Sequence, residues 1–154
     1  INLTDGVDGL AASVTAIIVT FLTVIAILFN VKEMVVYGSL VIGSAIGFLL
    51  FNLHTAKVFM GDTGSLLLGG IISAMALYLK IPLVLIIIAI VPIIETLSVM
   101  AQVTYFKKTG KRILKMAPLH HHLELSGWRE SKVVSVFSIV TLVACIIGLI
   151  SILN

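Results

Sequence analysis

Carboxylates and histidines gather in three polar segments that interrupt an otherwise apolar chain of 154 residues. The first segment, INLTDGVDGLA, carries Asp5 and Asp8, and the second, KVFMGDTGSLLLGG, sets Asp62 between glycines. The third, KKTGKRILKMAPLHHHLE, begins with five cationic residues in nine positions and ends near three adjacent histidines. Charged oxygen ligands suit Mg²⁺, while cationic and imidazole side chains suit phosphate binding or proton transfer. Together these residue types predict a phosphorylated substrate and a lipid acceptor.

The spacing of Asp5 and Asp8 allows two interpretations. If Thr4 or Asp5 caps a following helix, both carboxylates lie near its N-terminus at neighbouring positions. Glycines at positions 6 and 9 would then let the backbone come close to a ligand. The alternative is a helix cap with a glycine-rich lead-in and no role in binding.

The second segment concentrates polar groups where an apolar stretch ends. Four of them fall within eleven residues: Asn52, His54, Lys57 and Asp62. The Gly-Asp-Thr-Gly sequence predicts a turn that presents the Asp62 carboxylate, a ligand that Mg²⁺ takes together with substrate phosphates. Phe59 is either an anchor in the aromatic belt of the membrane interface or a platform on which a base stacks.

The third segment combines a basic run with histidines. The run from Lys107 to Lys115 is a juxtamembrane patch of the kind that meets anionic lipid. His120, His121 and His122 are candidate zinc ligands, but adjacent residues point in different directions and tetrahedral sites usually space their ligands. Phosphate binding or proton transfer is therefore the better expectation for these histidines.

Apolar helices must position these segments. Apolar residues make up 60% of the chain and charged residues 11%, with a mean hydropathy of +1.23, which excludes a soluble domain. We expect an all-α integral membrane protein with about five transmembrane helices, near residues 10–29, 34–53, 65–79, 82–106 and 133–153. The first stretch lacks a basic flank and is not a signal peptide. The single cysteine, Cys145, lies in the last stretch, which excludes an internal disulfide.

Charge is distributed unequally between the two sides of the expected membrane. Eight of the ten lysines and arginines fall on the side of the three polar segments, together with all four histidines. Only Lys32 and Lys80 fall on the other side. The positive-inside rule therefore predicts that the three segments share the cytoplasmic face.

The fourth apolar stretch contains Pro92, Glu95 and Gln102. An ionisable residue at membrane depth is functional or pairs inside the bundle, so Glu95 is expected to do one of these. Pro92 is expected to break or kink its helix, because it cannot donate a backbone hydrogen bond.

The stretches NLTDGVDGLA, FNLHTAKVFMGDTGSLLLGG and RILKMAPLHHHLELSGW closely resemble, in the same order, the phospho-N-acetylmuramoyl-pentapeptide transferase family of bacterial cell-wall synthesis. The first two also resemble the wider superfamily of polyprenyl-phosphate N-acetylhexosamine-1-phosphate transferases, and MAPLHHHLE points to the narrower family within it. The resemblance covers essentially the whole chain. It implies transfer of phospho-MurNAc-pentapeptide from UDP-MurNAc-pentapeptide to undecaprenyl phosphate, giving lipid I and UMP at the bacterial inner (plasma) membrane.

The resemblance also implies roles for particular residues. Mg²⁺ would be the cofactor, with Asp62 as its ligand, and the catalytic residues would be Asp62, Asp5 and His121. The substrate-binding residues would be Asn2, Asp5, Asp8, Asn52, Phe59, Gln102, His120, His121 and His122. Phe59 would stack on uracil, which replaces the membrane-anchor interpretation. Further partners would be membrane lipid, a second copy in a homodimer and nucleoside inhibitors of the tunicamycin and muraymycin type, with no nucleic acid.

The chain departs from the family pattern in one respect. Family members have about ten spans and an adjacent pair of aspartates in their N-terminal half, and no Asp-Asp occurs here. Residues 1–154 are therefore expected to form a single polytopic membrane segment, the C-terminal half of such an enzyme, inactive alone.

Three alternatives stand beside this assignment: a related GlcNAc-1-phosphate transferase, an ion-coupled transporter and a lipid-binding scaffold. A transporter relay should string ionisable residues through the membrane, whereas only Glu95 lies within an expected span. A scaffold would not need the two acidic segments.

Overall fold

The computed structural model describes residues 1–153 as an all-helical bundle. Its elements are a 3₁₀ turn, η1 (Asn2–Thr4), and the helices α1 (Leu10–Leu28), α2 (Lys32–Asn52), α3 (Gly61–Tyr78), α4 (Pro82–Ile88), α5 (Ile90–Thr109), α6 (Leu119–Glu124) and α7 (Glu130–Leu153). The expected all-α membrane fold is confirmed. Helix α3 begins at Gly61, inside the polar segment that precedes its apolar stretch.

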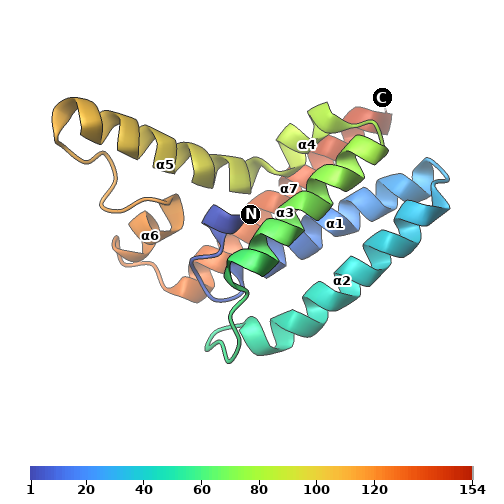
Figure 1. Cartoon of the computed structure of the whole chain (residues 1–154), viewed down its shortest axis with the longest axis horizontal. Helices are drawn as coiled ribbons and strands as arrows, with labels where there is room; N and C mark the ends of the chain where they lie inside the picture. Colours follow the sequence, from blue (N-terminus) through green and yellow to red (C-terminus); the bar gives the residue numbers. More distant parts are fainter. Residues whose placement is uncertain (154) are drawn as a thin grey trace.

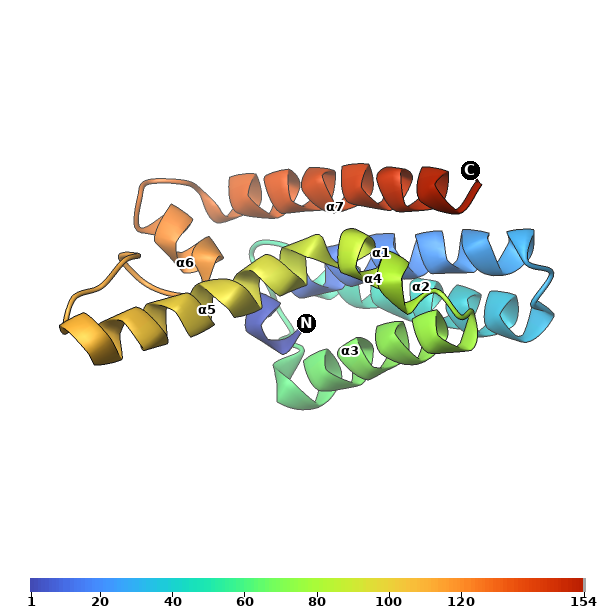
Figure 2. The same ribbon diagram turned by 90° about the horizontal axis from the view of Figure 1, so that it is seen from above.

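Helix α1 is the centre of the bundle, in contact with α2, α3 and α7 (Figures 1 and 2). Its most apolar window is 61% buried, against 17% for α2 and 33% for α7. The outer faces of α2 and α7 instead expose large apolar side chains, among them Leu40, Leu50 and Ile139. Such faces are stable against lipid hydrocarbon and costly in water.

Among the helices of residues 1–153, three are long and apolar enough to cross a membrane, namely α1, α2 and α7. The pair α4 and α5 would form a fourth span, but the two helices are bent by 78° at Ala89. Helix α3, counted as a span from the sequence, does not meet the same test of length and hydropathy. Thus the expected number of about five spans becomes three or four by this test.

The break between α4 and α5 is at Ala89. Pro92 follows three residues later and lies in the first turn of α5. Proline is tolerated there because the first N–H groups of a helix have no partner inside the helix. Pro92 cannot donate to the carbonyl of Ile88, so an unbroken α4–α5 helix would lose a hydrogen bond at this point. The expected break is present, and it directs α5 away from the bundle (Figure 2).

The three polar segments lie at one end of the bundle, and the short links 29–31 and 79–81 lie at the other (Figure 1). Each short link turns through a residue of positive φ, Asn30 at 56° and Lys80 at 58°. The alternation of ends expected from the sequence is therefore present in the fold.

The expected cap of the first helix is wrong. Thr4 belongs to η1 and Asp5 ends it, whereas α1 begins at Leu10 after Gly9, which has φ 78° and no side-chain cap. Glycine adopts this left-handed conformation without the steric cost that other residues carry. The chain thus turns before α1 begins, and neither Asp5 nor Asp8 lies within that helix.

Candidate active site

The first two polar segments are tied together by hydrogen bonds. Asn52, at the end of α2, accepts from the backbone N–H of Gly9 at 3.1 Å and donates to the Val58 carbonyl at 2.9 Å. The Asp8 carboxylate accepts from the backbone N–H of Ala56 at 3.0 Å. Asn52 is only 4% exposed, so its amide serves to hold the two segments in register.

Asp62 lies in the first turn of α3 rather than in a free turn, which corrects the sequence expectation. A carboxylate is stabilised there by the unpaired N–H groups and the positive end of the helix dipole. The Asn2 amide donates to Asp62 Oδ1 at 2.9 Å and to Ser65 Oγ at 3.0 Å. Asp62 is exposed, so its second oxygen is free to meet a ligand.

Asp5 and Asp62 form a pair of like charges. Burial raises the pKa of the Asp5 carboxyl above its usual value, and the negative charge of Asp62 raises it further. Two neighbouring carboxylates of this kind are stabilised by a shared proton or by a cation. The donor set, hard and oxygen-based, therefore fits Mg²⁺.

A polar hollow of about 240 Å³ opens beside these carboxylates. Its lining is drawn from the first two segments and includes Asp5, Asp8, Asn52, Phe59 and Asp62. The Phe59 side chain is 75% exposed, which leaves a ring face open to a planar ligand. Five of the residues chosen from the sequence are thus brought to one place.

His120 is buried against α5, where it meets Glu95. The Glu95 carboxylate accepts from the backbone N–H of His120 at 3.2 Å and lies 3.0 Å from its Nδ1. Both side chains are buried, with 1% and 0% exposed. An ionised carboxylate only accepts hydrogen bonds, so in its contact with an ionised Glu95 the donor is His120 Nδ1. Glu95 thus takes the second of its expected roles, pairing inside the bundle.

The other ring nitrogen of His120 points at the first segment. Among the described residues Nε2 has no hydrogen-bond partner although it is buried. It faces Gly6, where an added Cβ would collide with it and would lie 3.1 Å from Nε2 of His121. The absence of a side chain at Gly6 is therefore what lets the histidine helix approach the first segment.

The three histidines take different partners, as their adjacency suggested. His121 Nδ1 lies 2.7 Å from Glu124 Oε2, one helical turn away on α6. The His120 and His121 rings are 4.2 Å apart at their centroids. His122 Nδ1 instead accepts from the backbone N–H of Lys115 at 3.1 Å and holds the basic run in place.

Gln102 lies apart from the polar hollow. Its amide oxygen accepts from the backbone N–H groups of Ile113 and Leu114, each at 3.0 Å, and its nitrogen donates to the Leu114 carbonyl. It also lines a separate hollow of about 440 Å³ that contains Lys107 and Arg112. Its assignment to the sugar–peptide end stays a prediction.

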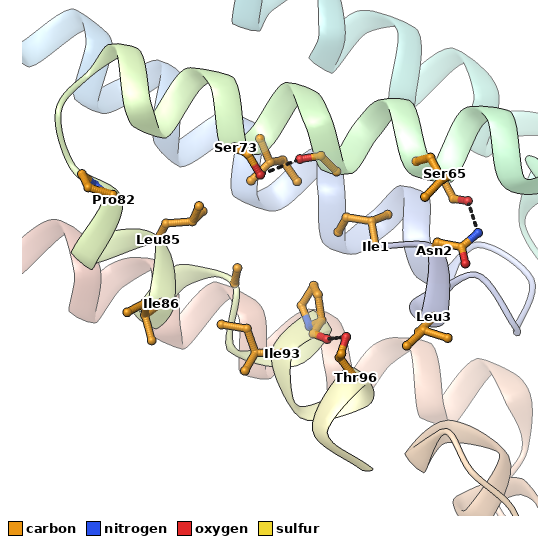
Figure 3. A pocket seen from close by; sticks show the side chains of 15 residues that line it. Ile1, Asn2, Leu3, Ser65, Ser73, Pro82, Leu85, Ile86, Ile93 and Thr96 are labelled. Carbon is orange, nitrogen blue, oxygen red and sulfur yellow. Dashed lines mark hydrogen bonds between the residues drawn. The ribbon is translucent and has the colours of Figure 1, made fainter. Parts of the chain in front are cut away.

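An apolar groove of about 520 Å³ runs along the other side of Asn2 (Figure 3). It is lined by the N-terminal residues, α3, α4 and the start of α5. Asn2 and Ser65 lie at its polar end, and Leu85, Ile86 and Ile93 lie along its length. The bend at Ala89 places α4 and α5 on this groove.

Four residues with polar contacts at this end were not predicted to be site residues: His54, Ser65, Glu124 and Glu130. The only signal for Glu124 was its spacing of three from His121, which brings the two side chains together on a helix. Glu130 is far from the first two segments in the sequence, and no local pattern connects it to them.

Residues 1–80 match a family model described as glycosyl transferase family 4. Proteins named phospho-N-acetylmuramoyl-pentapeptide-transferase from Clostridium acetobutylicum and Clostridium novyi are 53% and 51% identical, over 99% and 100% of this chain. A protein of the same name from Acetivibrio thermocellus is 52% identical over 96%. The aligned regions cover 48%, 47% and 45% of these relatives, so the chain spans about half the length of the curated relatives it matches.

Proposed function

The chain belongs to glycosyl transferase family 4, and we propose that the full-length protein transfers phospho-MurNAc-pentapeptide from UDP-MurNAc-pentapeptide to undecaprenyl phosphate. A new P–O bond forms to the lipid phosphate while the diphosphate bond to UMP breaks, giving lipid I. The relatives support the transferred group by their name. The UDP carrier and the undecaprenyl phosphate acceptor are what the family resemblance implies. Because these relatives share one name, we propose neither the GlcNAc-1-phosphate transferase nor the transporter.

One observation carries this proposal. The acidic pair Asp5 and Asp62, the ring of Phe59 and the histidines of α6 converge at one end of the bundle from three separate segments. A nucleoside diphosphate needs a cation or cationic groups for its phosphates and a flat apolar contact for its base. The hollow offers carboxylates that can hold such a cation, with the Phe59 ring beside them.

Asp62, with Asp5 beside it, would hold Mg²⁺. When bound, the cation would offset the negative charge that builds on the diphosphate as UMP leaves. Asn2 orients the Asp62 carboxylate through its amide. The stacking of Phe59 on uracil is supported by its exposed ring, and Asn52 holds the floor of the hollow.

His121 is the histidine best placed to meet the phosphates or the sugar. Its Nε2 faces the first segment, and Glu124 fixes the ring through Nδ1. An oriented imidazole of this kind can donate a hydrogen bond or move a proton. His120 also lies against Gly6 of the first segment, and Glu95 holds its buried ring in place.

The apolar groove beside Asn2 suits the isoprenoid chain of the acceptor. Its polar end is formed by Asn2 and Ser65, and it continues along apolar side chains of α4 and α5 (Figure 3). Asn2 also donates to Asp62. A lipid lying there would present its phosphate near Asp62.

We expect this end of the bundle to face the cytoplasm, since it carries eight of the ten lysines and arginines. Cysteines placed at Lys32 or Lys80 should then react with an impermeant reagent outside intact cells, and a cysteine at Lys111 should not. The reverse labelling would overturn the orientation.

The experiment that tests the activity is Asp62→Asn in the full-length protein, assayed for lipid I formation and UMP release. The amide keeps the shape but removes the charge that Mg²⁺ requires, so we expect near-complete loss of turnover with unchanged thermal stability. Raising the Mg²⁺ concentration should restore a small part of the turnover of this variant. Glu33→Gln, at the opposite end, should remain active. Normal turnover of Asp62→Asn at ordinary Mg²⁺ would contradict the assignment.

Three further proposals accompany this assignment. Residues 1–154 purified alone should show no turnover, because they span only about half the length of the curated relatives. Full-length protein should be thermally stabilised by a tunicamycin- or muraymycin-type nucleoside, and Phe59→Ala should reduce that shift. Cross-linking in membranes would test the expected homodimer.

A further inference from the structure

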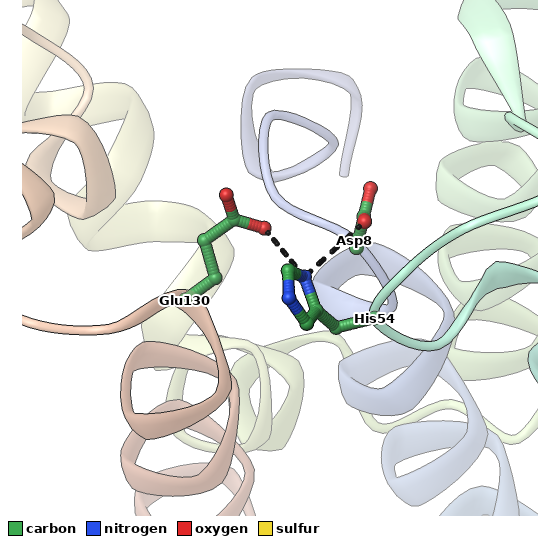
Figure 4. Close-up of side chains that lie close together, drawn as sticks. All are labelled: Asp8, His54 and Glu130. Carbon is green, nitrogen blue, oxygen red and sulfur yellow. Dashed lines mark ion pairs between the residues drawn. The ribbon is translucent and has the colours of Figure 1, made fainter.

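A histidine and two carboxylates meet at the end of the bundle that carries the polar segments (Figure 4). This cluster is separate from the buried Glu95–His120 pair. His54 comes from the second segment, Asp8 from the first and Glu130 from the first turn of α7. His54 Nδ1 lies 3.3 Å from Glu130 Oε2 and 3.6 Å from Asp8 Oδ2. One ligand atom from each residue lies within 4.8 Å of the other two.

These separations match a tetrahedral metal centre. Zinc binds imidazole nitrogen and carboxylate oxygen at about 2.0–2.2 Å, which places neighbouring ligand atoms roughly 3.4 Å apart. The two histidine–carboxylate separations already have this value within about 0.2 Å. Only the two carboxylates need to move, and both belong to side chains that are partly exposed.

The charge at this cluster is also that of a metal site. In residues 1–153 every ion pair includes a histidine, so no lysine or arginine directly neutralises Asp8 or Glu130. Two carboxylates and a neutral imidazole carry a charge of −2, which one divalent cation balances. The imidazole favours zinc and its neighbours over Mg²⁺ and Ca²⁺, which take oxygen ligands.

The surroundings of the cluster fit a bound ion. The backbone N–H of Ala56 donates to Asp8 Oδ2 and orients that carboxylate, as outer groups do around protein metals. The side chains of His54 and Glu130 are 51% and 40% exposed, so the fourth position is open to water.

We propose that Asp8, His54 and Glu130 form a binding site for a divalent transition metal of the zinc class, which ties the two acidic segments to the start of α7. Asp8 also lines the polar hollow. The ion would therefore hold the rim of that hollow, at a place separate from the Asp62 carboxylate.

Cobalt(II) tests this site because it replaces zinc and its absorption reports tetrahedral ligands. The full-length protein, purified without a polyhistidine tag, should bind Co²⁺ with a tetrahedral spectrum and release it to zinc. His54→Ala and Glu130→Gln should each weaken this binding by at least about 100-fold, since both remove a direct ligand.

Two variants serve as controls for other metal ligands in the protein. His122→Ala removes a histidine of α6, and Asp62→Asn removes the candidate Mg²⁺ ligand. Both should retain the cobalt spectrum. The proposal is overturned if the unmodified protein gives no tetrahedral spectrum, if His54→Ala keeps it, or if His122→Ala abolishes it. The cobalt experiment measures metal binding and not turnover. A negative result would therefore overturn the metal site and leave the proposed formation of lipid I unaffected.

Discussion

The buried pair Glu95–His120 and the exposed cluster of Asp8, His54 and Glu130 use the same chemistry in opposite environments. The shortest histidine–carboxylate separations are similar, 3.0 Å in the buried pair and 3.3 Å in the exposed cluster. In the buried pair the two side chains are 1% and 0% exposed, whereas the cluster ranges from 22% to 51%. Burial, not distance, separates a fixed scaffold from an adjustable site.

The buried pair and the exposed cluster differ in the free-energy cost of leaving a carboxylate without its partner. Water replaces the partner of an exposed charge at little cost, so exposed ion pairs contribute at most about 1 kcal/mol. A buried charge without its partner has no such replacement. We therefore expect Glu95 to hold His120 in one position, while the exposed His54 is free to bind a metal ion.

Among the changes that bear on this comparison, the largest effect is expected on turnover at His121, whose side chain is 29% exposed, between those of His120 (1%) and His54 (51%). His121→Ala in the full-length protein should lower the rate of lipid I formation by ~10²–10⁴, the range for a positioned polar or proton-transfer group. Insertion and purification should be unchanged, since Glu124 can be hydrated. Full activity of the variant would reduce these histidines to a polar interface loop.

The next effect separates the buried pair from the exposed cluster. Glu95→Ala leaves the His120 backbone N–H and Nδ1 without their acceptor, at a cost of about 3 kcal/mol. Thermal unfolding of the full-length protein in detergent should show this loss. Glu33→Ala, an exposed acidic control on α2, should unfold like the unmodified protein. Equal stability of the two variants would mean that the buried Glu95–His120 pair contributes no more to stability than an exposed carboxylate does.

A smaller effect is expected where the first segment meets His120. Gly6→Ala adds a Cβ that collides with Nε2 of a ring already held by Glu95, so we expect overpacking to cost about 1–3 kcal/mol. Gly70→Ala is the control, because its added Cβ would meet no atom within 4 Å. The two variants should differ in thermal stability and in turnover. If Gly6→Ala matches the control on both, the His120 ring is not confined.

The smallest effect is expected at Glu130. In metal-free buffer Glu130→Gln should change stability by less than about 1 kcal/mol, because the group is partly exposed. Zinc should raise the thermal midpoint of the unmodified protein but not that of the variant. A large loss without metal would instead make the cluster a structural ion pair like Glu95–His120.

Sequence reasoning reached the helices and the choice of candidate residues more readily than their contacts. Long apolar stretches require helices because a lipid environment leaves no other partner for the backbone, and α1, α2 and α7 follow from this alone. Asp5, Asp8 and Asp62 stood out because charge is rare in such a chain. The cap at Thr4 or Asp5 failed because Gly9 turns the chain just before Leu10.

The sequence by itself therefore determined an all-helical membrane protein, the residue types of its site, and the end of the bundle on which they gather. Only the tertiary structure decided which of these residues touch. Glu95 and His120 are 25 positions apart, and His54 meets Asp8 and Glu130 from different segments. Helix periodicity places side chains on the face of one helix, but the packing of helices around α1 and the bend at Ala89 set which faces meet.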